Sequence, residues 1–314
     1  MSRFRLGFGL TAIVVAVAGL AGLSPASAET LPVPWSFAAD VVAAPSGPDT
    51  PPPGANDWSC RPSAAHPEPV VLVHGLFATQ TDDWQTYGPL LANHGYCVFS
   101  FTYGNQTSLP WPMNDFGGLP AMEQSATVLG EFIDKVLSAT GASKVDLVGH
   151  SEGATMPYWY LKYDGGAAKV AKMIGLAPVV HGTGAPSSAY DQILTAFGLP
   201  ASQDAQLESY CAACSEFSPD STFITKLDAG GITVPGVSYT QIVTKDDELV
   251  IPYSSGIVDE PGSTNFVVQD QCPLDLADHL AIVADPVAAQ DVLNALDPAH
   301  PGPVPCTVVP PVIG

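Results

Sequence analysis

The clearest candidate for chemistry is a serine between two glycines, in the string Gly149-His150-Ser151-Glu152-Gly153. The apolar run Val145 to Val148 precedes this string, and a helical pattern follows it. Glycines on both sides of a serine tolerate the close backbone approach of a strained strand-to-helix turn, which exposes the serine Oγ above a sheet. Ser151 is therefore a candidate nucleophile. The alternative is an ordinary turn between a strand and a helix.

A nucleophilic serine needs a histidine base, which a carboxylate must orient. In folds with this turn, the residues follow in the order Ser, acid, His. Of the seven histidines, only His279 and His300 follow the last predicted acid-bearing strand, and His300 lies in a Pro-rich string. His279 lies in a loop between a predicted strand and a predicted helix, so we expect it to be the base. We expect His74, His150 and His181 to be structural.

Three neighbouring carboxylates compete for the role of the acid. Asp246, Asp247 and Glu248 directly follow the predicted strand Val237 to Val243, where the acid should emerge. Asp247 is the first choice and Asp246 the second. A solvated acidic loop is the alternative for those that remain.

Two backbone N–H groups are candidates to bind an oxyanion. The N–H of Glu152 follows the serine, and that of Leu76 lies in the loop after the first predicted strand. Each donor of this kind typically contributes about 3 kcal/mol to lowering the barrier. This chemistry calls for no metal and no organic cofactor, and we expect neither.

The elements that must position these residues alternate between strand and helix. Apolar runs predict strands at Val70–Val73, Cys97–Phe101, Lys144–Val148, Lys172–Ala177, Val237–Val243 and Phe266–Val268. Helical patterns lie at Trp84–Asn93, Met122–Thr140, Glu152–Lys162 and Val283–Leu296. The alternation predicts an α/β fold, with a mostly parallel central sheet and helices on both faces. The long interval 179–235 between two predicted strands predicts a cap-like insertion.

The first residues have the pattern of a secretory signal peptide. Arg3 and Arg5 precede an apolar run from Leu6 to Leu23, and small residues at 26–28 offer a cleavage site. A membrane anchor is the alternative, but the run ends in Ser-Pro and has no basic stop-transfer flank. We expect residues 1–28 to be removed and the protein to be secreted, without a stable membrane anchor.

The rest of the chain predicts one acidic domain. Residues 29–67 are rich in Pro, Gly, Ser and Ala, which predicts an irregular arm. Residues 68–314 form the expected catalytic domain, which ends in a Pro-rich tail. The net formal charge of −21 disfavours nucleic acid and anionic lipid as partners. We expect a monomer.

Six cysteines in a chain bound for an oxidising compartment predict three disulfides, although sequence alone permits 15 pairings. Cys60 and Cys97 flank neighbouring predicted strands, which favours their pairing. Cys211 and Cys214 form a CxxC, for which a local disulfide is favoured over a redox or zinc role because no second CxxC or nearby His pair accompanies it. Cys272 and Cys306 remain, and their bond would hold the tail.

Several strings together resemble those of a known family, the secreted α/β-hydrolase lipases and in particular the class-2 bacterial lipases. The strings are Val70 to Leu76, Gly149 to Gly153, Leu176 to Thr183, Asp247 to Val250, and Asp278-His279. The resemblance implies an α/β-hydrolase fold and hydrolysis of lipid esters such as triacylglycerols through an acyl-enzyme, at an oil-water interface. It also assigns the acid to Asp247 and an oxyanion donor to Leu76, and the Cys60/Cys97 and Cys272/Cys306 pairs are similar to those of such lipases. Glu152 departs from the Gln or Met of many relatives.

The predicted substrate site is an apolar rim in residues 103–122. Its candidate binding residues are Trp111, Met113 and Phe116, together with Phe77 of the loop after the first strand. A well-packed loop is the alternative. A polyester depolymerase or cutinase, an acyltransferase, and a non-catalytic binding protein on a hydrolase fold remain alternative functions.

Overall fold

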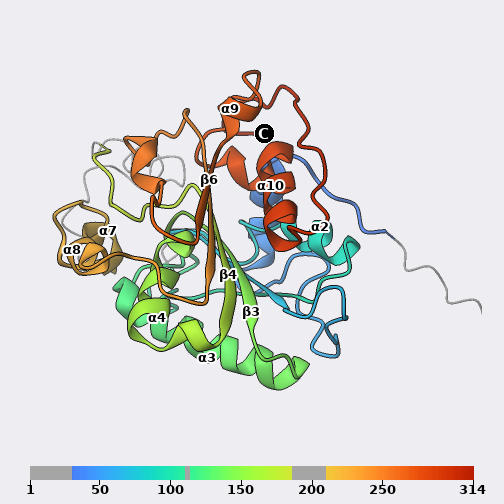
Figure 1. The fold of residues 1–314 in the computed structure, drawn as a ribbon, viewed down its shortest axis with the longest axis horizontal. Helices are drawn as coiled ribbons and strands as arrows, with labels where there is room; N and C mark the ends of the chain where they lie inside the picture. Colours follow the sequence, from blue (N-terminus) through green and yellow to red (C-terminus); the bar gives the residue numbers. More distant parts are fainter. Residues whose placement is uncertain (1–29, 110–113, 186–209) are drawn as a thin grey trace, which may run out of the picture. The chain divides into compact units, whose positions relative to one another are not determined.

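The apolar runs form a six-stranded sheet whose neighbouring strands are all parallel (Figure 1). In sheet order the strands are β2 (Val98–Phe101), β1 (Val70–Val73), β3 (Val145–His150), β4 (Val170–Leu176), β5 (Ser238–Val243) and β6 (Ser263–Val267). Five of them lie close to the predicted bounds, whereas β6 begins three residues before the predicted Phe266–Val268, and Val268 is the first residue of a helix. The predicted α/β fold with a parallel sheet is therefore confirmed.

The structure is a computed structural model that describes residues 30–314 except 110–113 and 186–209. The expected signal peptide, residues 1–28, lies outside the described residues, as do Trp111 and Met113. Among the described residues, no helix has the length and apolar character needed to cross a bilayer.

Helices connect the strands and cover both faces of the sheet. The α-helices are α1 (Ala38–Ala43), α2 (Tyr87–Asn93), α3 (Met122–Thr140), α4 (Met156–Tyr163), α7 (Ala212–Glu216), α8 (Thr222–Asp228), α9 (Val268–Gln271) and α10 (Pro286–Leu296). Short 3₁₀ turns are η1 (Ala44–Ser46), η2 (Ser151–Ala154), η3 (Gly166–Ala168), η5 (Tyr253–Gly256) and η6 (Ala281–Ala284). Helices α3 and α4 lie on one side of the sheet and α2 and α10 on the other (Figure 1).

The period of two along each strand divides the core into two layers. In β1, Val71 and Val73 pack with α3 and α4, whereas Val70 and Leu72 pack with α2 and α10. All four side chains are fully buried. Burial on both faces is why these strands are continuous apolar runs without alternation.

Two helical segments also differ from the sequence prediction. The helix expected over Glu152–Lys162 is divided, because the 3₁₀ turn η2 comes first and α4 begins only at Met156. The arm expected to be irregular contains a helix, α1. The carboxylate of Asp40 in α1 is buried and accepts the N–H of Gln85, so a tertiary contact fixes a helix too short to be stable alone.

The N-terminal arm is attached to the domain along its length. The side-chain amide of Asn93 bonds both the N–H and the carbonyl of Leu31, at 2.9 and 2.8 Å. The Thr86 hydroxyl donates to the carbonyl of Pro34 at 2.6 Å, and the Ser36 hydroxyl donates to that of Ile313. Residues 31–50 therefore belong to the folded unit.

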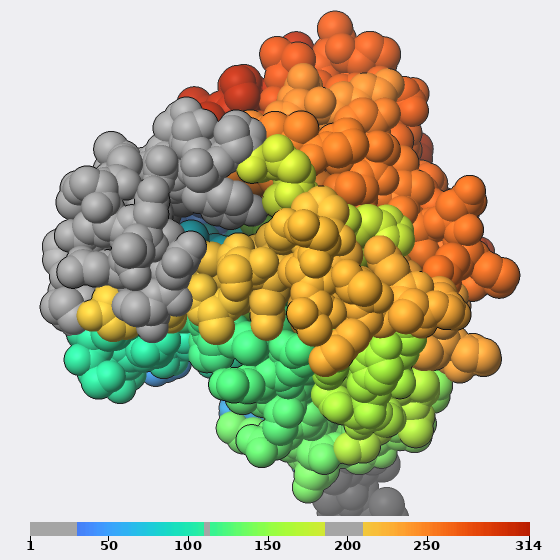
Figure 2. Space-filling model, turned by 90° about the vertical axis from the view of Figure 1, so that its left-hand side faces the viewer, coloured from blue at the N-terminus to red at the C-terminus, as the bar shows by residue number. Residues whose placement is uncertain are grey.

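The described part of the insertion carries α7 and α8. Its surface, residues 210–235, lies between the segment of α3 and α4 and the C-terminal part of the chain (Figure 2). Phe223 of α8 stacks on Trp159 of α4, with ring centroids 5.2 Å apart. The insertion thus packs on the helix that follows the candidate nucleophile.

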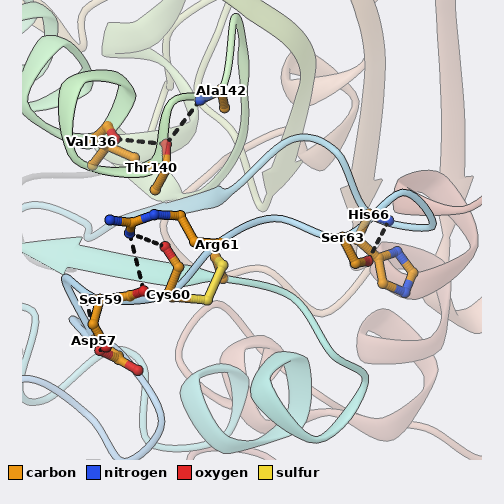
Figure 3. Close-up of a disulfide and its surroundings, with 10 residues drawn as sticks. Asp57, Ser59, Cys60, Arg61, Ser63, His66, Val136, Thr140 and Ala142 are labelled. Atoms are coloured by element: carbon orange, nitrogen blue, oxygen red, sulfur yellow. Dashed lines mark hydrogen bonds between the residues drawn. A yellow bond between two sulfur atoms is a disulfide. The ribbon is translucent and has the colours of Figure 1, made fainter.

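The three favoured disulfides are present: Cys60–Cys97, Cys211–Cys214 and Cys272–Cys306. Next to the first, Arg61 donates hydrogen bonds to the carbonyls of Ser59 and Cys60 (Figure 3). The local disulfide at Cys211–Cys214 excludes a zinc role for that CxxC in this structure.

The length of the loop that each disulfide closes predicts how much stability its removal would cost. Cys60–Cys97 spans 37 positions and Cys211–Cys214 only 3. The loop-closure relation predicts that replacing the longer pair by alanine lowers the free energy of unfolding by about 4 kcal/mol, against about 2 kcal/mol for the shorter pair. Urea unfolding of the two double variants measures both. An equal or reversed order would contradict this explanation.

Candidate active site

A tight turn exposes the candidate nucleophile at the end of β3. Ser151 has a φ of +53°, a left-handed conformation that non-glycine residues rarely adopt. A Cβ on Gly149 would lie 1.9 Å from the carbonyl oxygen of Gly153, and one on Gly153 would lie 2.0 Å from that of Val73. Both glycines are therefore required by contact between backbones, as the sequence pattern predicts.

Thr155 fixes this turn to the neighbouring strand. Its hydroxyl donates to the carbonyl of Ser151 at 3.0 Å and accepts the N–H of Val179 at 2.8 Å. Val179 follows β4, so the turn is held from the side of the sheet as well as by its own helix.

The structure distinguishes the three competing carboxylates. Both oxygens of Asp247 lie 3.0 Å from Nδ1 of His279, and Oδ1 also accepts the N–H groups of Leu249 and Val250. Asp247 and His279 are both buried. Asp246 is exposed, and Glu248 only accepts the backbone N–H of His279. Asp247 is therefore the carboxylate placed to orient the ring.

The surroundings of His279 favour its protonated form. Burial alone would lower the pKa of the imidazole, but the charge of Asp247 and its hydrogen bond outweigh burial. Glu248 and Asp83 add to this effect, and the pKa of His279 is raised above its ordinary value. Because Nδ1 donates to Asp247, Nε2 is the nitrogen left to accept a proton from a nucleophile.

The loop after β1 presents backbone N–H groups beside the serine. A Cβ on Gly75 would lie 3.2 Å from the Cβ of Ser151, so the loop is in direct contact with the turn. Phe77 has a φ of +64°, a strained conformation of the kind that collects at functional sites. Among the described residues, none accepts a hydrogen bond from the N–H of Leu76. The first N–H groups of a helix have no partner within that helix. The N–H of Glu152 is one of these, because Glu152 lies in the first turn of η2.

His74 supports this loop from within the core. Its Nε2 accepts the N–H of Tyr103 at 3.1 Å, so Nδ1 carries the proton and donates to the carbonyl of Gly75 at 2.8 Å. Burial lowers the pKa of His74 to about 4, so the ring is neutral at neutral pH. This is the structural role expected for it.

His181 and His300 lie in other surroundings. His181 pairs with Asp228 at 2.7 Å, and its side chain is partly exposed. His300 pairs with Asp297 near the C-terminus, and its side chain is largely exposed.

Ser151, His279 and Leu76 border one pocket with largely apolar walls. Its other described lining residues are Phe37, Val41, Ala44, Phe77, Ala78, Asp82, Asp83, His150, Val179, Phe217, Leu249, Val250 and Leu280. Part of the wall therefore comes from α1 and η1 of the N-terminal arm, which sequence reasoning missed. Phe37, Val41 and Ala44 have the i, i+4, i+7 spacing of one helix face, but this signal is only two turns long and lies in a stretch rich in Pro, Gly, Ser and Ala.

The predicted substrate residues have different outcomes. Phe77 lines the pocket beside Ser151 and His279. Phe116 is buried behind it, with ring centroids 5.5 Å apart, and is not among the described lining residues. Leu119 is fully buried as well. The described end of this loop is thus packed in the core rather than exposed as a rim, and Trp111 and Met113 lie outside the described residues.

Glu152 combines a backbone role with an unusual side chain. The carboxyl group is fully buried, and neither oxygen has a hydrogen-bond partner in the described part of the chain. The nearby Tyr103 hydroxyl donates instead to the carbonyl of His74. Burial raises the pKa of Glu152 well above its ordinary value, the neighbouring Tyr103 hydroxyl opposes part of the rise, and the charge of Glu216 adds to it. Glu152 therefore keeps its proton at pH values at which an ordinary glutamic acid is ionised.

Across the described ranges, no cluster of three or more His, Cys, Asp or Glu side chains is arranged to hold a metal ion.

The fold is the α/β-hydrolase fold. The sequence profile of the family described as lipase (class 2) matches residues 67–292, and the chain belongs to this family. A triacylglycerol lipase of Pseudarthrobacter phenanthrenivorans is 38% identical over 95 residues, which cover 29% of this chain and 27% of that lipase. The chain thus matches about a quarter of that relative's length.

Solved lipase structures share the fold. Lipase B of Aspergillus fumigatus has a TM-score of 0.57 at 20% identity, covering 82% of this chain and 60% of its own. The mature lipase BlEst2 of Bacillus licheniformis has a TM-score of 0.53 at 14% identity, covering 75% of this chain and 94% of its own.

The buried acid predicts a stability difference that depends on pH. The pKa of Glu152 is raised in the folded state, so above the ordinary pKa of 4.5 the folded protein retains a proton that the unfolded chain has lost. This contribution to stability falls as pH rises. Glu152→Gln removes this dependence on pH. Above pH 4.5, the free energy of unfolding of the variant should therefore rise relative to that of the wild type by up to about 1.4 kcal/mol per pH unit.

Urea unfolding of both proteins between pH 5 and pH 9 measures this difference. The variant Glu131→Gln, on the exposed face of α3, controls for the loss of one negative charge. A constant gap between wild type and Glu152→Gln across this range would contradict the prediction.

Proposed function

We propose that this protein is a serine carboxylester hydrolase that cleaves lipid esters such as triacylglycerols through an acyl-enzyme. The observation that carries the proposal is one apolar pocket bordered by Ser151, His279 and Leu76, with Asp247 bonded to the far side of the imidazole. Membership of the class 2 lipase family supports the same reaction.

In the first half of the reaction, Ser151 Oγ attacks the ester carbonyl carbon while Nε2 of His279 takes the hydroxyl proton. The carbonyl oxygen becomes an oxyanion, which the N–H groups of Leu76 and Glu152 bind. The negative charge of Asp247 stabilises the imidazolium that forms. The intermediate then expels the alcohol, which receives its proton from His279, and the acyl group remains on Ser151.

In the second half, water replaces the alcohol. His279 takes a proton from the water, whose oxygen attacks the acyl carbon, and the same two N–H groups bind the second oxyanion. The bond to Ser151 Oγ breaks, the serine regains its proton, and a carboxylic acid leaves. Neither half needs a metal ion or an organic cofactor.

The pocket supports an apolar acyl group as the part of the substrate that is recognised. Its walls include Val41, Phe77 and Phe217, and an acyl chain gains roughly 0.8 kcal/mol for each methylene that it buries.

We also propose secretion. The signal-peptide pattern of residues 1–28 supports it, as do the three disulfides, which persist in oxidising compartments.

The nucleophile is tested by Ser151→Ala. Loss of the only nucleophile in the proposed reaction should reduce hydrolysis of a short-chain nitrophenyl ester by about 10⁴- to 10⁶-fold, with an unchanged circular dichroism spectrum. Asp247→Asn should reduce it strongly as well, while Asp246→Asn, its exposed neighbour, should leave it within about twofold. Wild-type turnover by the folded Ser151→Ala protein would rule out the proposed reaction.

Substrate panels separate the proposed function from its alternatives. Emulsified triacylglycerol should be cleaved faster than a polyester film. When an alcohol acceptor is added, the acyl group should still be released as the free acid. A preference for the film would indicate a polyester depolymerase, and acyl transfer to the alcohol would indicate an acyltransferase. Failure of a fluorophosphonate to label Ser151 would indicate a binding protein.

The wall formed by the arm is tested at α1. Val41 lines the pocket, whereas its neighbour Val42 is 79% exposed and is not among the described lining residues. Val41→Asp should raise KM for a nitrophenyl decanoate about 5- to 30-fold, because a charge replaces apolar contact, and should change KM for the acetate much less. Val42→Asp is the matched control. Equal effects of the two substitutions would contradict a role of α1 in acyl binding.

A further inference from the structure

A second pair of carboxylate and histidine lies directly beside the first. Oδ1 and Oδ2 of Asp83 lie 2.9 and 3.2 Å from Nδ1 of His150, the residue before the candidate nucleophile. Both side chains are almost completely buried, at 2% and 4% exposure, and both border the floor of the pocket. The ring of His150 lies 5.0 Å from that of His279, between centroids. The reaction described above gives neither residue a role.

This pair joins three separate segments of the site. Oδ2 of Asp83 accepts the N–H of Gly75 at 2.9 Å, immediately before Leu76. Nε2 of His150 lies 2.9 Å from the backbone carbonyl oxygen of His279. One hydrogen-bonded chain therefore connects the loop of the oxyanion donor, the residue before the nucleophile, and the backbone of the base.

The partners of His150 determine how the ring is used. Its two nitrogens face a carboxylate and a carbonyl oxygen, which can only accept hydrogen bonds. Each of these oxygens can accept a hydrogen bond from the ring nitrogen that it faces, so both ends of the ring are held by other segments of the site.

There is little free space in which the three segments could shift independently. A Cβ on Gly75 would lie 3.2 Å from Nδ1 of His150 and 3.2 Å from the Cβ of Ser151. The hydrogen bonds of His150 therefore lie where the Gly75 loop and the Ser151 turn are already in close contact. A displacement of about 1 Å in a reacting group can reduce a rate by about 100-fold.

We propose that Asp83 and His150 are positioning residues for ester hydrolysis, which hold the Leu76 N–H, the Ser151 hydroxyl and the His279 ring in one reactive geometry. The inference rests on the proposed function. It assigns no proton transfer to either residue, because both nitrogens of His150 are already engaged. The acyl chain is recognised by the apolar walls, so the role concerns the rate of the chemical steps more than substrate affinity.

Two substitutions of Asp83 distinguish its hydrogen bonds from the space that its side chain fills. Asp83→Leu removes the acceptor for both Gly75 and His150. Asp83→Asn keeps the connection: the amide oxygen can accept the Gly75 N–H, and the amide nitrogen can donate to Nδ1 of a neutral His150, whose Nε2–H still reaches the His279 carbonyl. The asparagine variant therefore acts as the conservative rescue.

The experiment measures kcat and KM for a nitrophenyl ester, together with the rate at which a fluorophosphonate labels Ser151. Asp83→Leu should lower kcat and the labelling rate about 10- to 100-fold with KM within about threefold, and Asp83→Asn should recover most of the loss. Asp146→Asn is the control for loss of a buried carboxylate. Its partner is Lys172, and it lies at the opposite end of β3 from His150, so it should leave kcat unchanged.

The outcomes distinguish failure of this inference from failure of the proposed function. A wild-type protein that cleaves no ester and whose Ser151 is not labelled contradicts the proposed function itself. An active wild type with wild-type kcat in folded Asp83→Leu overturns the positioning role, as does Asp83→Asn that is no faster than Asp83→Leu. If Asp83→Leu does not fold, His150→Phe takes its place, because it removes both hydrogen bonds from the side of the ring.

Discussion

The contact of Gly153 with the carbonyl of Val73 is the constraint on which the site depends. Any side chain at position 153 would lie 2.0 Å from that oxygen, so the turn after β3 can press against the end of β1 only without one. β1 and β3 are parallel neighbours, and their carboxyl ends lie at the same edge of the sheet. This contact therefore brings the loop of Leu76 beside Ser151. The strained φ of Ser151 is tolerated because backbone packing and the Thr155 hydroxyl hold the turn from both sides.

The remaining groups reach the same edge from the other half of the sheet. Asp247 follows β5 and His279 lies beyond β6, so parallel pairing alone brings their loops near the end of β3. Pairing does not fix orientation to the accuracy that proton transfer requires. Hydrogen bonds do so: Asp247 holds the ring of His279, and His150 holds its backbone. The sheet thus brings the loops of the site to one edge, and buried hydrogen bonds orient the side chains on them.

Much of this arrangement could be predicted from the sequence, because buried parallel strands are continuous apolar runs and the turn requires two glycines. The order Ser, acid, His then left only His279 and His300, and the Pro-rich string around His300 favoured His279. Among the three adjacent carboxylates, the family resemblance favoured Asp247, but the physical reason needed coordinates, since Asp246 and Asp247 differ in burial and not in chemistry. Asp83 was missed because a carboxylate in a loop has no periodicity. A signal existed nonetheless: His150 ends a buried strand, and a buried imidazole needs polar partners somewhere in the fold.

The charges around the pocket bear on how a product would leave. An ester is neutral, but its acid product is an anion at neutral pH. Among the described lining residues there is no Lys or Arg, and the carboxylates of Asp83 and Asp247 already have histidine partners. Burial raises the pKa of Asp82 to about 7, so this carboxyl group gains its charge as pH rises through neutrality. A fatty-acid anion would thus lie in a largely apolar pocket beside a like charge, which raises the free energy of the ionised product there. For the proposed reaction, the same walls that bind the acyl chain of the ester therefore disfavour its ionised product.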